Sequence, residues 1–305
     1  MAEAAAEPTR CGYVAILGAP NVGKSTLLNR LVGSKVSIVS PKVQTTRTRI
    51  LGIAIEGAAQ IVYLDTPGIF FTPRRRFERA MVAAAWQGAA DADLVLLLVD
   101  TSRRKLDEDT ERILAGLEKS RRKAILVLNK IDLVKREALL ALSRTLHGTG
   151  LFTEVFMVSA ETGDGVADLP KALAPKLPMG PWLFPEDQLT DMPQRLLAAE
   201  VTREQLFRQL HQEVPYSLIV ESEAWEEFKD GSAKIDQTIF VERESQKAIV
   251  VGKAGTRIKA VREAAQRELE AMLERRVHLF LQVKVRENWA EDRGRFRDLG
   301  LDYDV

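Results

Sequence analysis

The amino-acid sequence predicts an α/β protein: a first domain with a mainly parallel, doubly wound sheet, followed by a smaller α+β domain. Two observations carry this prediction. From residue 12 to about residue 175, short apolar runs alternate with amphipathic stretches, and a proline-rich segment then separates this region from a second, shorter pattern. Continuous apolar runs are typical of strands buried on both faces, as in parallel sheets. A chain of 305 residues has room for two domains.

The apolar runs are expected to form the strands of the first domain. The amphipathic segments between most of them are expected to be helices, which is the βαβ rhythm of a doubly wound fold. The predicted strands are 12–18, 50–56, 60–65, 93–100, 123–130 and 154–160, and the predicted helices are 24–33, 76–90, 107–119, 136–147 and 166–175. Only residues 57–59 separate the second strand from the third, so these two are expected to form an antiparallel hairpin.

A boundary between the domains is expected at the proline-rich segment. The predicted organisation is a flexible N-terminus at 1–11, a first domain at 12–176, a linker at 177–193 and a second domain at 194–305. The predicted elements of the second domain are a helix at 194–212, strands at 216–222 and 235–242, a helical segment from 246, a long helix at 256–274 and a strand at 277–285. Their order is therefore α-β-β-α-α-β.

Composition and charge exclude several other classes of protein. The chain is 46% hydrophobic and 29% charged, as in ordinary soluble proteins, and its net charge is +1. Cys11 is the single cysteine, so neither an internal disulfide nor a cysteine metal cluster can form. The sequence shows neither a secretory signal nor an apolar run long enough to span a membrane. The chain is therefore expected to be soluble and cytoplasmic.

The stretch GAPNVGKST, which joins the first predicted strand to the first predicted helix, fits the pattern G-x-x-x-x-G-K-[ST]. Gly18 and Gly23 would let the backbone wrap closely around phosphate oxygens. The N–H groups at the start of the following helix would then point at the anion. Lys24 offers a positive charge to the β- and γ-phosphates, and Ser25 offers a hydroxyl to Mg²⁺. The sequence therefore predicts a phosphate-binding loop.

Three further motifs follow strands, at the sheet edge where open α/β proteins bind ligands. DTPG places Asp65 to hold a magnesium-bound water and the Gly68 N–H to touch a γ-phosphate. NKID places Asp132 to accept two hydrogen bonds from guanine, which adenine cannot supply; such a bidentate contact discriminates by roughly 1–3 kcal/mol. Asn129 and Lys130 would brace this loop and cover the base. SAETG, which follows the last predicted strand, would add backbone contacts through Ala160.

These four motifs, in this order, resemble those of the TRAFAC class of P-loop GTPases. In the relatives, a metal-binding threonine stands directly before an arginine, which selects Thr46 in QTTRTR, although Thr45 stays open as the alternative. Ile69 follows DTPG where Ras-like proteins have a glutamine that orients water, so slow intrinsic turnover is expected. The resemblance also implies that Asn21 helps to hold K⁺ beside the phosphate loop.

In the second domain, GKAG lies between two predicted helices and matches the G-x-x-G loop of a KH domain. Small residues at both ends would let a nucleic-acid backbone approach, and Lys253 would meet phosphate. Ile249, Val250 and Ile258 are expected to floor a groove for unstacked bases. The segment 243–262 carries six basic residues and one acidic residue, so this otherwise neutral chain has a locally basic patch.

A P-loop GTPase followed by a KH domain resembles the Era family of bacterial GTPases across nearly all of the chain. The resemblance implies GTP hydrolysis to GDP and phosphate with Mg²⁺, and binding to the 3′ end of 16S rRNA during assembly of the small (30S) ribosomal subunit. It also implies a monomer with some peripheral association at the inner membrane.

Catalysis is expected to come mostly from positioning and charge neutralisation. The predicted catalytic residues are Lys24, Thr46 and Gly68, and the predicted metal ligands are Ser25, Thr46 and Asp65. The predicted nucleotide-binding residues are Asn21, Val22, Gly23, Lys24, Ser25, Thr26, Asn129, Lys130, Asp132, Ser159 and Ala160. The predicted RNA-binding residues are Gly252, Lys253, Ala254, Gly255, Arg257 and Lys259.

Three alternatives compete with this interpretation. A P-loop ATPase or kinase is disfavoured by NKID, and competition of GTP against ATP would separate the two. An RNA-binding protein with a vestigial nucleotide site is disfavoured by the intact Lys24, Ser25 and Asp65. A tRNA-modifying GTPase would share the phosphate loop but would lack the KH-like tail.

Overall fold

The computed structural model describes residues 8–42, 45–69, 76–103, 105–210, 214–287, 293–298 and 300–305. The chain divides into two compact units. The first unit comprises Met1–Ser37, Thr46–Asp191 and Gly300–Val305, and the second comprises Ile38–Thr45 and Met192–Leu299. A short segment from the early part of the chain thus belongs with the second unit.

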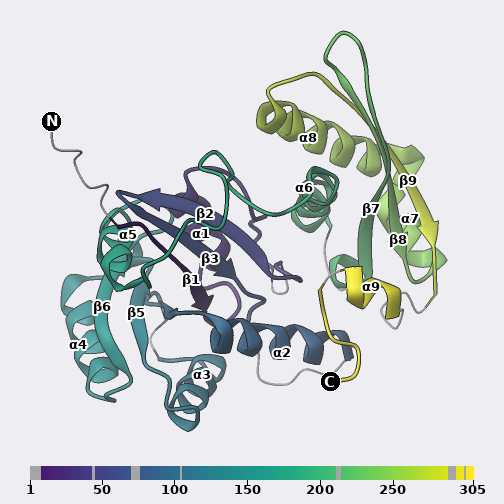
Figure 1. The fold of residues 1–305 in the computed structure, drawn as a ribbon. Coiled ribbons are helices and arrows are strands. Elements are labelled where there is room, and N and C mark those ends of the chain that lie inside the picture. Colours follow the sequence, from purple (N-terminus) through teal and green to yellow (C-terminus); the bar gives the residue numbers. More distant parts are fainter. Residues whose placement is uncertain are drawn as a thin grey trace, which may run out of the picture. The chain divides into compact units, whose positions relative to one another are not determined.

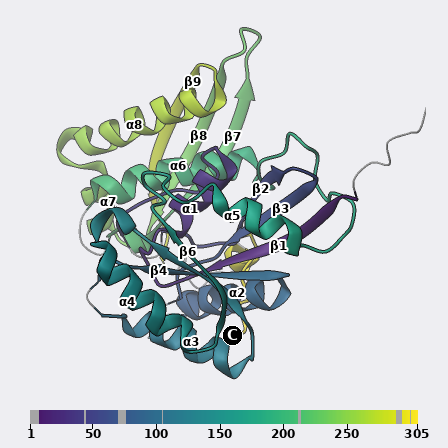
Figure 2. The same ribbon diagram turned by 90° about the vertical axis from the view of Figure 1, so that its left-hand side faces the viewer.

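The first unit is built on a six-stranded sheet, shown from two directions in Figures 1 and 2. Its strands are β1 (Arg10–Leu17), β2 (Ile50–Glu56), β3 (Ala59–Asp65), β4 (Leu94–Asp100), β5 (Ala124–Asn129) and β6 (Phe152–Val158). Their order across the sheet is β2-β3-β1-β4-β5-β6. The β2–β3 pair is antiparallel and every other pair is parallel, which confirms both the parallel sheet and the hairpin.

Helices cover both faces of this sheet. They are α1 (Lys24–Val32), α2 (Arg76–Asp91), α3 (Glu108–Lys119), α4 (Arg136–His147) and α5 (Asp168–Leu173), with short 3-10 helices at Ile131–Leu133 (η1) and Ala174–Lys176 (η2). Figures 1 and 2 show α2 and α3 on one side of the sheet and α1 and α5 on the other. The helices α2, α3 and α4 bury apolar side chains against alternate residues of the strands, because successive strand residues point to opposite faces.

This topology brings the predicted motifs together. Strands β1, β3, β4, β5 and β6 run in the same direction, so their carboxyl ends lie at one edge of the sheet. The phosphate loop follows β1, DTPG begins with the last residue of β3, NKID begins with the last residue of β5, and SAETG follows β6. The sheet therefore holds the four segments at one edge, which is where this class of fold binds ligands.

The proline-rich segment packs on the first unit up to Asp191. Gln60 on β3 is fully buried, and its amide makes three hydrogen bonds to the backbone of this segment. Its Oε1 accepts the N–H groups of Leu183 (2.9 Å) and Phe184 (3.0 Å), and its Nε2 donates to the Phe184 carbonyl (2.8 Å). The segment that the sequence predicts as a linker is thus bound to β3 at residues 183 and 184.

The second unit has a three-stranded sheet in the order β7-β8-β9. Its elements are α6 (Gln194–Gln209), η3 (Val214–Ser217), β7 (Leu218–Glu227), β8 (Ala233–Val241), α7 (Glu244–Val251), η4 (Lys253–Gly255), α8 (Thr256–Leu273), β9 (Val277–Val285) and α9 (Arg293–Asp298). The β7–β8 pair is antiparallel and the β8–β9 pair is parallel. The order α-β-β-α-α-β is confirmed, and α9 follows the last expected strand.

Two apolar clusters stabilise this second unit. They join α6, α7 and α8 to one face of the sheet. Among the residues described, no helix combines the length and the apolar character needed to cross a bilayer.

Replacement of Gln60, whose buried amide binds the proline-rich segment, should destabilise the folded protein. We expect Gln60→Leu to lower the free energy of unfolding by about 2 kcal/mol, because the part-buried N–H and C=O groups of residues 183 and 184 lose their hydrogen-bond partner. Urea unfolding would measure this, and limited proteolysis should show faster cleavage within 177–191. Gln87→Leu, at an exposed position of α2, is the matched control and should change stability by no more than about 0.5 kcal/mol. Equal stability of the two variants would contradict the packing described.

Candidate nucleotide site and RNA-binding loop

The phosphate loop is shaped by Gly23 and closed by Lys24. Gly23 has φ 99°, and a Cβ at this position would lie 2.4 Å from Asn129 Nδ2, so both conformation and space require glycine. Helix α1 begins at the next residue and directs its first N–H groups into the loop. Lys24 is buried, and its Nζ donates to the carbonyls of Gly18 and Ala19, each at 3.0 Å. The loop thus wraps around a positive charge.

Three hydroxyls converge on one oxygen of Asp65. Oδ2 accepts hydrogen bonds from Ser25 Oγ (2.6 Å), Ser37 Oγ (3.1 Å) and Thr46 Oγ1 (3.3 Å). The Ser25 and Thr46 hydroxyls are themselves 2.9 Å apart. The Thr45 hydroxyl instead donates to the Lys42 carbonyl at 2.7 Å. The predicted metal ligands Ser25, Thr46 and Asp65 are therefore adjacent, and the geometry favours Thr46 over the alternative Thr45.

The electrostatics of this cluster fit a divalent cation and a phosphate. Burial lowers the pKa of Lys24 to about 8, although the charge of Asp65 opposes the change. Burial likewise raises the pKa of Asp65 against the opposing effects of Lys24 and the hydroxyls. Asp65 Oδ1 is buried and has no hydrogen-bond partner among the described residues. A hard cation prefers such oxygen ligands, so carboxylate and hydroxyls suit Mg²⁺. Within the described ranges, His, Cys, Asp and Glu side chains form no cluster of three or more that suggests another metal site.

The DTPG segment lies against the phosphate loop. The Ile69 N–H donates to the Gly18 carbonyl at 3.3 Å, and a Cβ on Gly68 would lie 3.1 Å from Pro20 Cα. The Ile69 side chain is buried. Gly68 is thus held close to the loop, where the sequence predicts that its N–H meets a γ-phosphate, and the residue after it packs into the core.

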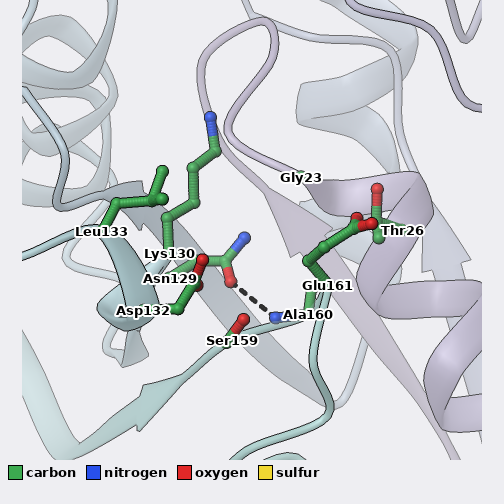
Figure 3. Close-up of a pocket in the computed structure, with 9 residues that line it drawn as sticks. All are labelled: Gly23, Thr26, Asn129, Lys130, Asp132, Leu133, Ser159, Ala160 and Glu161. Carbon is green, nitrogen blue, oxygen red and sulfur yellow. Dashed lines mark hydrogen bonds between the residues drawn. The ribbon is translucent and has the colours of Figure 1, made fainter.

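A pocket of about 270 Å³ lies beside the phosphate loop, with its lining residues drawn in Figure 3. The lining residues come from the phosphate loop and from the segments after β5 and β6: Gly23, Thr26, Asn129, Lys130, Asp132, Leu133, Ser159, Ala160 and Glu161. Asn129 is buried between these segments. Its Nδ2 donates to the Val22 carbonyl (2.7 Å), and its Oδ1 accepts the Ala160 N–H (2.9 Å). One side chain thus connects three predicted nucleotide-binding segments.

Lys130 forms one wall of this pocket. It has a left-handed backbone with φ 67°, and its Nζ donates to the Asn21 carbonyl (2.9 Å) and to Asp100 Oδ2 (2.7 Å). Burial alone would raise the pKa of Asp100, but hydrogen bonds from Lys130 and Ser102 hold it below its ordinary value. Lys130 is therefore fixed across the phosphate loop by a carboxylate at the end of β4.

The turn after β6 is also fixed internally. The Ser159 hydroxyl accepts the Thr162 N–H at 3.1 Å, and Arg30 of α1 donates to the carbonyls of Ala160 (3.4 Å) and Glu161 (2.5 Å). Asp132 lies on η1 and lines the same pocket. The predicted nucleotide-binding residues of the two segments thus surround one cavity.

Sequence reasoning missed several residues that support this site. Asp100 ends strand β4, so the argument from strand ends could have found it. Asn29 holds Ser37 in place: its Oδ1 accepts the Ser37 N–H (2.9 Å), and its Nδ2 donates to the Ser37 carbonyl (2.7 Å). A serine in an irregular segment carries no comparable signal in the sequence.

In the second unit, the GKAG loop has an unusual backbone. Gly252, Ala254 and Gly255 have φ of 74°, 49° and 74°, and a Cβ on Gly252 would lie 2.7 Å from the Arg257 Cβ. Lys253 and Ala254 are exposed between the glycines. The loop therefore presents its backbone and a lysine to solvent, as a G-x-x-G loop should.

The basic residues next to the GKAG loop are exposed as expected, but one of the apolar residues expected to line a groove for bases is not. Lys253, Arg257 and Lys259 are exposed, and Arg257 Nη1 donates to the Ile249 carbonyl at 2.6 Å. Ile249 is 38% exposed, but Val250 is fully buried in the apolar core of the unit. The expectation that Val250 floors a groove for bases is therefore wrong, because this face of α7 packs inward.

Each of the two units contains a region that matches a known protein family. Residues 13–130 match the model of a 50S ribosome-binding GTPase family, and residues 213–290 match that of the KH domain. GTPase Era of Rhizobium meliloti (strain 1021) is 59% identical over 300 residues, which is 98% of this chain and 95% of that protein. GTPase Era of Afipia carboxidovorans is 57% identical over 303 residues, covering 99% and 98% of the two chains.

This chain belongs to the Era family of GTPases.

Solved Era structures have the same fold over almost the whole chain. A variant of Aquifex aeolicus Era bound to GDP and AlF4⁻ is 39% identical, with a TM-score of 0.89, and covers 97% of this chain and 100% of its own. Era in complex with MgGDPNP and nucleotides 1506–1542 of 16S ribosomal RNA is 40% identical, with a TM-score of 0.90 and the same coverage. The predicted GTPase fold and KH domain are confirmed, and as an Era-family member this chain is a GTP-hydrolysing enzyme.

The base specificity assigned to Asp132 stays a prediction that one substitution tests. Asp132→Asn should weaken GTP binding and favour xanthosine triphosphate, because one of the two acceptors of the carboxylate becomes a donor. The loss for GTP should be roughly ten- to a hundredfold, as for removal of a bidentate base contact. Competition titrations with the two nucleotides would measure it, and Asp187→Asn, an exposed position outside the pocket, is the control. An unchanged preference for GTP would remove Asp132 from the base site.

Proposed function

We propose that this Era-family GTPase is a switch that binds the 3′ end of 16S rRNA through its KH domain and assists assembly of the small ribosomal subunit. The observation that carries this proposal is the GKAG loop, which has positive φ at both glycines and exposes Lys253 close in sequence to the exposed basic residues Arg257 and Lys259. The relative solved with MgGDPNP and 16S rRNA nucleotides, whose fold this chain shares, supports the identity of the RNA.

In the nucleotide site, each group has a defined task. The α1 N-terminus and Lys24 bind the phosphates, and Ser25, Thr46 and Asp65 hold Mg²⁺, directly or through water. The ion supplies charge neutralisation at the phosphate oxygens when it is bound. Asn129, Lys130, Asp132, Ser159 and Ala160 surround the guanine. Relatives solved with GDP–AlF4⁻ and with MgGDPNP support this assignment of ligands.

Hydrolysis then depends on positioning more than on acid–base chemistry. Lys24 and the Gly68 N–H offset the negative charge that develops on the γ-phosphate. Thr46 fixes its own segment beside the γ-phosphate. The buried Ile69 contributes no polar group to orient water. We infer slow intrinsic turnover for this reason.

The resemblance also implies a cytoplasmic monomer with some peripheral binding at the inner membrane, and this stays a proposal. Sedimentation velocity would measure the oligomeric state, and co-sedimentation with anionic vesicles would measure membrane binding.

The proposed potassium site beside the phosphate loop makes a prediction about Asn21. Hydrolysis should be several-fold faster in K⁺ than in Na⁺ at equal ionic strength, and Asn21→Gly should lose that difference. Glycine is the better replacement, since Asn21 has φ 64° and glycine adopts this conformation without strain. Phosphate release would be measured in both salts, with GDP affinity as the control for the intact loop. Equal rates of GTP hydrolysis by the wild-type protein in the two salts would contradict the proposed potassium site.

The RNA proposal makes a prediction about Lys253. Lys253→Asp should weaken binding to an oligonucleotide of the 16S 3′ end by roughly tenfold and reduce the salt dependence of binding, because it removes a phosphate contact and repels the backbone. GTP affinity should be unchanged. Titrations at several salt concentrations would measure both.

The design of this test follows from the loop geometry. Gly252→Asp is unsuitable, because its Cβ would clash with Arg257 and because φ is positive. Lys229→Asp is the matched control, since it reverses the same charge at an exposed site in the turn between β7 and β8. RNA binding by a folded Lys253→Asp protein as tight as that of the control would show that GKAG is only a helix turn.

A further inference from the structure

Ser37 follows helix α1 in the first unit and contributes a hydroxyl that has no place in the magnesium site proposed above. Its side chain is 1% exposed, and its Oγ donates to Asp65 Oδ2 at 3.1 Å. The same oxygen accepts the hydroxyls of Ser25 and Thr46, the two proposed hydroxyl ligands of Mg²⁺. The third hydroxyl of this cluster therefore has no task assigned to it.

Helix α1 and the turn after it carry Ser37 to this position. Ser25 and Asn29 are four residues apart on α1, so they lie on the same face of the helix. Gly33 ends the helix with φ 75°, a conformation that glycine adopts without strain, and the chain then returns along this face. The return brings Ser37 beside Asn29 and the Ser37 hydroxyl beside Asp65.

The Asn29 side chain holds the backbone of this returning segment at three points. Its Oδ1 accepts the N–H groups of Val36 and Ser37, each at 2.9 Å, and its Nδ2 donates to the Ser37 carbonyl at 2.7 Å. Both main-chain polar groups of Ser37 are thus satisfied by one side chain of α1. The Ser37 hydroxyl is therefore held by the same helix that begins with the phosphate-loop residues Lys24 and Ser25.

The two oxygens of the Asp65 carboxylate are in opposite situations. Oδ2 accepts three hydroxyl donors, whereas Oδ1 is buried and has no hydrogen-bond partner among the described residues. A buried carboxylate oxygen without a partner costs free energy, and a cation or its bound water would supply that partner. The terminal torsion of an aspartate is broad, so donors on one oxygen are needed to hold the other in a fixed direction.

We propose that Ser37 is a positioning residue of the magnesium site, which holds Asp65 Oδ2 so that Oδ1 stays directed at the cation or its bound water. The inference rests on the roles proposed above for Ser25, Thr46 and Asp65 in binding Mg²⁺. Ser25 and Thr46 would serve the ion as well as Asp65, whereas Ser37 binds Asp65 alone. Removal of a group that orients a metal ligand in this way typically lowers metal affinity by roughly 10- to 100-fold.

The test measures affinity for Mg²⁺ separately from affinity for nucleotide. A fluorescent GDPNP analogue is titrated onto the whole chain in EDTA and at a series of free Mg²⁺ concentrations, which gives the metal-free affinity and the Mg²⁺ midpoint. Ser37→Ala should raise the Mg²⁺ midpoint about tenfold, because the Asp65 carboxylate is less well oriented. Affinity for the analogue in EDTA should stay within about twofold of wild type, because Ser37 is coupled to the nucleotide only through the ion.

Two further variants make the result specific. Ser37→Cys fills the buried space, but a thiol is a weak donor, so the Mg²⁺ midpoint should rise as in Ser37→Ala. Ser232→Ala is the matched control, because Ser232 is also buried and donates its hydroxyl to an aspartate, Asp230 Oδ1, at 2.6 Å. This control lies in the second unit and should leave the Mg²⁺ midpoint unchanged. If urea unfolding shows that Ser37→Ala does not fold, Ser37→Cys carries the test.

The variant Asp65→Asn separates this inference from the function on which it rests. If Asp65→Asn raises the Mg²⁺ midpoint while folded Ser37→Ala and Ser37→Cys proteins do not, the role of Ser37 is refuted and that of Asp65 stands. If Asp65→Asn leaves the midpoint unchanged, the proposed metal site fails, and the inference about Ser37 fails with it.

The double variant shows whether Ser37 acts through Asp65. Adding Ser37→Ala to Asp65→Asn should change the Mg²⁺ midpoint by less than about twofold, because the carboxylate that Ser37 orients is already gone. Fully additive shifts would contradict action through Asp65. A loss of GDPNP affinity by Ser37→Ala that is as large in EDTA as in Mg²⁺ would show a merely structural role and would also overturn the proposal.

Discussion

The nucleotide site depends on two opposite charges, Lys24 and Asp65, that are buried together at the carboxyl edge of a parallel sheet. Burial lowers the pKa of Lys24 and raises the pKa of Asp65, and both changes favour the neutral forms. The opposite charge of the partner, and for Asp65 the hydrogen bonds from hydroxyls, favour the charged forms. Lys24 donates hydrogen bonds to two carbonyls of the phosphate loop, and Asp65 accepts hydrogen bonds from three hydroxyls of separate segments. These contacts fix the conformation of the phosphate loop and of the segments that carry the three hydroxyls.

Asn129 and Lys130 extend this organisation to the pocket that we propose for the base. Their side chains bind main-chain groups of the phosphate loop, and Asn129 also binds the turn after β6. The pocket is therefore assembled from segments that are far apart in sequence, with the buried Asn129 amide between them. Because main-chain carbonyls and N–H groups are the partners, these contacts depend on backbone conformation.

The second unit relies on backbone conformation in another way. The GKAG loop has positive φ values at Gly252, Ala254 and Gly255 and exposes its two central residues, while the neighbouring α7 buries Val250 in the core. The same unit contains α6, whose buried Glu200, Arg203 and Glu204 would be unusual in a helix with no partner beyond the core. Glu204 and Arg203 bind main-chain groups of the segment Ile38–Thr45, and Glu200 pairs with Arg203.

The sequence by itself determined the order of the strands and of the helices up to α8, the phosphate loop, the positions of NKID and SAETG after strands, and the GKAG loop. These features follow from local rules, because glycine conformation, helix N-termini and apolar periodicity are written in neighbouring residues. Tertiary structure alone decided that Ser37 binds Asp65, that Gln60 anchors the proline-rich segment, that Val250 faces inward and that Arg203 holds the Thr45 carbonyl. Each of these depends on side chains meeting distant backbone or carboxylate groups, and no spacing in the sequence encodes which distant groups will be brought within hydrogen-bonding distance.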